Sequence, residues 1–142
     1  MKKFRPAAAP LITVDPFLSI WSCDDALYGG PTEHWCGRPC PILAGIYVDN
    51  AFHAIAAADE NGKVLRSRVY QTDLEITPLS TIYTFENEAA LVKLTFTTPL
   101  LPDRPDILAR PVSYVHYEVK PKTAKPVRFL FGISARACVD NK

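Results

Sequence analysis

The sequence has almost no excess of either charge. Its 16 lysines and arginines stand against 15 aspartates and glutamates, which leaves a formal net charge of +1. Proteins that bind nucleic acids usually gather basic residues on one face or along one element. The basic residues here are spread along the chain, so we expect no nucleic-acid partner.

Long apolar runs are also missing. No stretch approaches the roughly 18 consecutive apolar residues of a membrane-spanning helix, so we expect no membrane partner. The basic start Met1–Lys3 is followed by Phe4, Arg5 and Pro6, where a signal peptide would have its apolar core. We therefore expect no export signal in this chain, which as it stands would be cytoplasmic, while the location of a longer parent protein stays open.

Cysteine and glycine are scarce. The four cysteines, at positions 23, 36, 40 and 138, are too few and too unevenly spaced for a disulfide scaffold, so free thiols are expected. Glycine occurs six times. The pair Gly29-Gly30 is followed by Pro31 rather than by a helix, and this order does not favour a phosphate-binding loop.

Helical periodicity is absent over three turns, whereas 13 prolines cut the chain into short extended pieces. Apolar and polar residues alternate in 91–97, 115–119 and 127–135, the period of a strand with one buried face. We therefore predict an all-β fold, an antiparallel β-sandwich of about nine strands. Its core is expected to contain Phe96, Tyr117, Phe129 and Phe131.

The organisation along the chain is predicted to be a single β-sandwich region over 1–142. It has an extended lead-in (1–10), an N-terminal segment (11–60) and the main strands (61–142). The long apolar strand over 127–135 ends close to Lys142, so we expect the sandwich to be incomplete at its C-terminal end.

Local signals give more detail. Asp49-Asn50 and Asn61-Gly62 predict tight turns. A bulge or strand break is expected near Gln71-Thr72. Between the prolines of 99–111, only 106–110 could form a helical turn.

The segment HWCGRPCP, residues 34–41, holds the densest group of unusual side chains. Thiolates and imidazole suit zinc, but Cys36 and Cys40 have no matching second pair, and a fourth ligand would have to come from His53, His116 or a distant acid. The alternative is an irregular loop anchored by a buried Trp35. We predict no catalytic, cofactor-binding or metal-ligating residue, and name His34, Trp35 and Arg38 as surface or interdomain contacts.

Five segments resemble, in the same order, the N-terminal region of the glutaminase A family. They are PLITVDPFLSIWS (10–22), EHWCGRPCPILAGIYVD (33–49), TIYTFE (81–86), LTFTTPLLPDRPDILARPVSYVHYEV (94–119) and FLFGIS (129–134). In that family an N-terminal all-β region precedes a helical toroid domain thought to convert glutamine into glutamate and ammonia.

The resemblance implies a β-sandwich that is truncated relative to a multidomain parent. It would be non-catalytic by itself and would pack on a C-terminal helical domain of the same parent chain. We expect no cofactor. Family members are often exported. Cys36 and Cys40 stand where we expect polar residues, and free thiols indicate a reducing compartment.

Two other functions remain open. Trp21, Tyr28, Trp35 and Tyr47 could form the aromatic surface of a carbohydrate-binding accessory sandwich in a glycoside-hydrolase-like protein. Alternatively, the domain could mediate assembly into a homo-oligomer through an exposed apolar patch.

Overall fold

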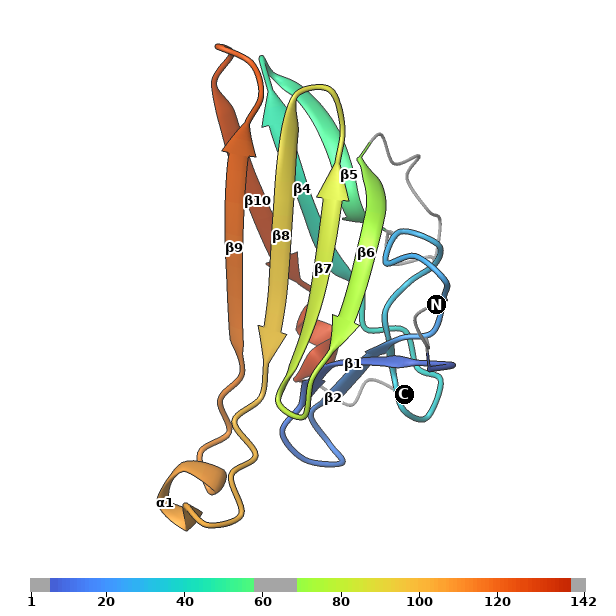
Figure 1. Cartoon of the computed structure of the whole chain (residues 1–142). Coiled ribbons are helices and arrows are strands. Elements are labelled where there is room, and N and C mark those ends of the chain that lie inside the picture. The colour runs from blue at the N-terminus through green and yellow to red at the C-terminus, as the bar shows by residue number, and fades with distance from the viewer. Residues whose placement is uncertain (1–5, 58–68, 139–142) are drawn as a thin grey trace.

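The computed structural model describes residues 6–57 and 69–138 (Figure 1). Within these ranges the chain forms ten strands and only short helical pieces, which confirms the all-β prediction. The strands make three antiparallel sheets, and the four-stranded sheet and one of the two three-stranded sheets lie face to face as a sandwich (Figure 1). The predicted turn at Asn61-Gly62 lies outside the described residues.

The larger sandwich sheet has four strands in the order β6-β7-β8-β9. In β8 the apolar residues alternate with polar ones as predicted, and Val92, Leu94 and Phe96 are buried. A register shift between Gln71 and Asp73 confirms the expected irregularity in β6. The bounds are β6 (Tyr70–Ile76), β7 (Ser80–Glu86), β8 (Ala90–Thr97) and β9 (Tyr114–Pro121).

The facing sheet has the order β10-β4-β5, and β4 is its central strand. The bounds are β4 (Ile42–Val48), β5 (Ala51–Ala57) and β10 (Val127–Ile133). Asp49 and Asn50 link β4 to β5 with φ values of 49° and 65°, which confirms the predicted tight turn. Short polar residues tolerate this left-handed conformation better than other non-glycine residues.

The two sheets share one hydrophobic core. Phe96 of β8 is 1% exposed, and its ring lies 6.5 Å from that of Phe131 on β10. Phe129 and Phe131 are partly buried and pack against this core. The prediction for Tyr117 is wrong, because its side chain is 52% exposed although its ring stacks on Phe129 at 4.2 Å. Both β9 and β10 are edge strands, so no further strand of the described chain covers this end of the core.

The third sheet lies across one end of the sandwich (Figure 1). It consists of β1 (Ala9–Thr13), β2 (Ser19–Ser22) and β3 (Glu33–His34), in that order. The first strand therefore begins inside the expected extended lead-in. Leu11 and Ile12 join the common core, so this sheet is packed onto the sandwich rather than separate from it.

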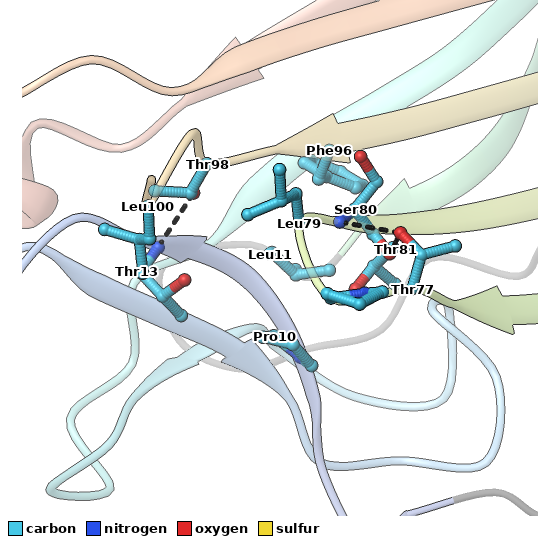
Figure 2. Close-up of a pocket in the computed structure, with 11 residues that line it drawn as sticks. Pro10, Leu11, Thr13, Thr77, Leu79, Ser80, Thr81, Phe96, Thr98 and Leu100 are labelled. Atoms are coloured by element: carbon cyan, nitrogen blue, oxygen red, sulfur yellow. Dashed lines mark hydrogen bonds between the residues drawn. The ribbon is translucent and has the colours of Figure 1, made fainter. Parts of the chain in front are cut away.

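One hydroxyl group joins the end of β1 to the residue that follows β8, as Figure 2 shows. The Thr13 amide donates to Thr98 Oγ1 at 3.3 Å, and Thr98 Oγ1 lies 2.8 Å from Ser113 Oγ. The Ser80 amide donates to Thr77 Oγ1 at 3.0 Å. The cavity beside these bonds has a volume of about 40 Å³, room for no more than a few water molecules.

The connection from β8 to β9 contains α1 (Pro105–Leu108), close to the predicted helical turn at 106–110. Arg104 pairs with Asp106 at 2.9 Å. The hydrogen bond from Arg104 holds the pKa of the Asp106 carboxyl below its usual range, and the same bond raises the pKa of Arg104. After β10 the chain forms the short 3₁₀ helix η1 (Ala135–Ala137).

Candidate functional site

The segment from His34, the last residue of β3, to Cys40, shortly before β4, forms a hydrogen-bonded loop. The Gly37 amide donates to His34 O, and the His34 amide donates to Arg38 O, both at 2.8 Å. Gly37 has a φ of 81°, in the left-handed region that glycine adopts without steric cost. The Cys40 amide donates to Thr32 O at 2.9 Å and closes the loop. The predicted irregular loop is therefore confirmed.

This loop is bonded to the turn between β1 and β2. The Pro16 carbonyl accepts a hydrogen bond from Trp35 Nε1 at 2.6 Å and another from His34 Nε2 at 2.9 Å. Within the turn, Asp15 Oδ1 accepts from the amides of Phe17 and Leu18 at 2.7 and 2.8 Å. Two surface loops are thus held together by a single backbone carbonyl.

The bond to Pro16 also determines which ring nitrogen of His34 carries the proton. A carbonyl can only accept, so His34 Nε2 is the donor and, in the neutral ring, Nδ1 is an acceptor. The Cys36 Sγ lies 2.9 Å from Nδ1, and the Cys36 amide donates to the same nitrogen at 3.3 Å. His34 therefore bridges the Cys36 thiol and the β1–β2 turn.

Arg38 connects the loop to the chain after β10. Its Nη2 donates to the Arg136 carbonyl at 3.3 Å. The Cys40 Sγ lies 3.7 Å from the same oxygen. The loop is therefore attached on one side to the β1–β2 turn and on the other to η1.

An open hollow of about 550 Å³ lies between these segments. His34 and Arg38 line it, so the structure brings two of the three predicted contact residues to one place, with Trp35 beside them. Phe17 is 88% exposed. Sequence reasoning missed the contribution of Asp15, Phe17 and the η1 segment, because only chain folding brings them to the loop.

The prediction that Trp35 is buried is wrong, since its side chain is 63% exposed. Its indole N–H is satisfied by Pro16, and the His34 ring lies beside it at 5.6 Å between centroids. Trp35 anchors the loop through this hydrogen bond and leaves much of its apolar ring at the surface.

The thiols and imidazoles are distributed as follows. None of the four cysteines, all of which lie in the described residues, forms a disulfide bond, as expected. Among the residues that the structure describes, no group of three or more histidine, cysteine or acidic side chains is arranged to hold a metal ion. His53 lies on β5 and His116 on β9, on strands away from the loop.

In 6–57 and 69–138, no helix is long and apolar enough to cross a membrane.

A second open hollow, of about 1050 Å³, lies at the other end of the sandwich, where the β4–β5, β7–β8 and β9–β10 turns meet (Figure 1). Lys122 pairs with Glu86, and Lys125 pairs with Asp49 at 3.2 Å. Exposed ion pairs of this kind contribute little energy and present no concentrated charge. The first hollow, which the exposed Phe17 lines, is therefore the better candidate site.

Comparisons with known families divide the chain in two. Residues 1–61 match a family model described as Domain of unknown function (DUF4964), and residues 79–142 match one described as Domain of unknown function (DUF5127). No curated protein and no solved structure matches the chain. In the structure, β4 from the first matched segment pairs along its whole length with β10 from the second. The chain is thus similar to two families whose matched segments build one shared β-sandwich.

Proposed function

We propose that this chain is the non-catalytic N-terminal β-sandwich of a glutaminase-A-like amidohydrolase. In the parent protein it packs on a C-terminal helical domain that converts glutamine into glutamate and ammonia. The observation that carries this proposal is the ordered resemblance of five segments between residues 10 and 134. The all-β fold is the one that the resemblance implies for this region.

In this proposal, the helical domain contacts the His34–Arg38 loop. The segments 10–22 and 33–49, both part of the resemblance, meet there through the bonds to the Pro16 carbonyl. Phe17 and Trp35 are 88% and 63% exposed, and adjacent exposed aromatic side chains mark interaction surfaces. A neighbouring domain would cover both rings.

The test is an ammonia-release assay with glutamine, on the product of the complete gene and on residues 1–142 alone. We expect turnover only by the complete product. Either turnover by residues 1–142 or an inactive complete product would overturn the proposal.

Phe17→Ala combined with Trp35→Ala should lower the melting temperature of the complete product. In residues 1–142 alone, Phe17→Ala should change the unfolding free energy by no more than about 0.5 kcal/mol, because its ring is exposed. Trp35→Ala also removes the hydrogen bond to Pro16, so it should cost about 0.5–1.5 kcal/mol there.

Carbohydrate binding is a second candidate, favoured by the exposure of Trp35. A sugar ring stacks on an exposed aromatic face, and the Trp35 indole is held in place by its bond to Pro16. Binding to a glycan panel should then be lost in Trp35→Ala and kept in Tyr70→Ala, which removes an equally exposed aromatic side chain from β6. Binding that survives Trp35→Ala would exclude this site.

A further inference from the structure

In the part of the chain that the structure describes, no strand pairs with the outer edge of β9. β9 is the last strand of its sheet, and all eight of its residues pair with β8 without a register shift. Natural edge strands are commonly blunted by a bulge, a proline or crowded charge, because unpaired backbone groups recruit other strands. The proline in β9 is Pro121, its last residue. The strand is therefore a template for pairing along most of its length.

The opposite edge of the same sheet is protected. β6 carries the irregularity between Gln71 and Asp73, which interrupts a regular row of backbone groups. The acidic residues of β6 also disfavour pairing of this strand with β6 of a second copy. An antiparallel copy centred on Leu74 would set Asp73 against Glu75, and like charges directly opposite are destabilising.

The side chains of β9 fall into two faces. Val115 and Val119 pack against the core, and Tyr117 stacks on Phe129 of the facing sheet. His116 and Glu118 lie on the other face, where their side chains are 3.7 Å apart. Tyr114 and Lys120 share this outer face, because side chains alternate along a strand.

If a two-fold axis perpendicular to the sheet relates two copies of the chain, the inward faces of both β9 strands lie on the same side of the combined sheet. In an antiparallel pair, directly opposite side chains share a face, so the axis must pass between two copies of the same residue. We name each register by that central residue. In the register centred on Tyr117, His116 of each copy lies opposite Glu118 of the other copy, so this pair occurs two times. Val115 then meets Val119, Tyr114 meets Lys120, and the two Tyr117 side chains meet at the axis.

The neighbouring registers lack this complementarity. Centred on Glu118, the pairing sets the two Glu118 carboxylates against each other and His116 against Lys120. Centred on His116, it sets the two imidazoles against each other and leaves Glu118 opposite Tyr114. Of these three registers, the one centred on Tyr117 therefore sets the His116 imidazole, a hydrogen-bond donor, opposite the Glu118 carboxylate, which accepts.

We propose that the outer edge of β9 is a homodimer interface, on which β9 of a second copy of this chain adds antiparallel in the register centred on Tyr117. The two four-stranded sheets then become one continuous sheet. The second copy covers Tyr114 and Tyr117, which are 60% and 52% exposed in the single chain. This interface involves neither the loop nor the helical domain of the proposed function, so it can fail or hold independently.

The first experiment is sedimentation of the chain at about 100 µM, where even weak edge pairing is populated. We expect a dimer. His116→Glu sets glutamate against Glu118 in two places and should raise the dimer dissociation constant about tenfold or more. The double variant His116→Glu with Glu118→His restores opposite partners and should recover the dimer. A monomeric wild-type chain, or a dimer indifferent to His116→Glu, would overturn the proposal.

A cysteine probe tests the register. In a background with Cys23, Cys36 and Cys138 changed to serine, Tyr117→Cys places two thiols opposite each other, at a Cα separation of about 4.5–5.5 Å that allows a disulfide. Oxidised glutathione, which accepts the two electrons, should give a covalent dimer. His116→Cys in the same background should not, because each thiol then lies opposite residue 118. Equal cross-linking of the two variants would contradict the register.

Discussion

Replacing Phe96 with alanine is expected to lower the free energy of unfolding by about 3–5 kcal/mol, the usual cost of removing a fully buried aromatic ring. Phe96 is 1% exposed and lies between the sheets, with its ring edge-on to Tyr83 at 6.4 Å and tilted against Phe131 at 6.5 Å. Truncation removes apolar burial and leaves a cavity that neighbouring strands cannot fill. Urea denaturation followed by circular dichroism measures the loss.

Two further phenylalanines supply matched controls for the same substitution. Phe17→Ala should change stability by less than about 0.5 kcal/mol, because its side chain is 88% exposed. Phe131→Ala should fall between the two, since Phe131 is partly buried on an edge strand. Equal losses at Phe96 and Phe17 would mean that the two sheets do not enclose a packed core.

Replacing Gly45 with alanine is the second large effect, with an expected loss of about 1–3 kcal/mol from overpacking. A Cβ at this position would lie 2.5 Å from two ring carbons of Phe52 and 2.6 Å from the His53 carbonyl oxygen. The carbonyl belongs to the neighbouring strand and cannot rotate away. Gly45 also stands where the β4–β5 register shifts, a place where glycine permits close backbone approach.

Gly132→Ala on β10 is the control for Gly45→Ala. A Cβ at Gly132 meets no atom within 4 Å. Alanine there should leave stability unchanged or raise it by about 0.4–1 kcal/mol, because it restricts the unfolded chain. Comparing the two denaturation midpoints separates the steric effect at Gly45 from the general effect of replacing glycine. A Gly45→Ala protein with the same unfolding free energy as the unchanged chain would contradict the close approach of β5 to Gly45.

The parts of the fold that depend on neighbouring residues could be predicted from the sequence. Alternation in 91–97 predicted the buried face of β8, and Asp49-Asn50 predicted the β4–β5 turn. The irregularity near Gln71 and the helical turn before residue 110 were also predicted. Each of these follows from the residues' own backbone preferences and from the two-residue period of a strand.

Side-chain exposure was less predictable, because it depends on what lies opposite in space. In β7, alternation gives two faces, and the inward one holds Thr81, Tyr83 and Phe85 while Ile82 points the other way and is only half-buried. Trp35 satisfies its N–H on Pro16 and stays at the surface. Tyr117 is on the inward face as expected, yet it remains half-exposed at the sheet edge.

The candidate site, too, was only partly predictable from the sequence. His34, Trp35 and Arg38 stood out in the sequence because their segment combines aromatic, basic and thiol side chains with prolines. Their partners at Pro16, Phe17 and Arg136 could not be identified, because these residues are brought to the loop by the pairing of β1 with β2 and of β10 with β4.

The sequence by itself determined the all-β class, the turns and the faces of the main strands, because these follow from local backbone preference and period. Only the tertiary structure decided which strands are edges, which aromatic rings are covered, and which loops meet. Those properties depend on pairings between distant segments, such as β4 with β10, and a local pattern carries no information about them.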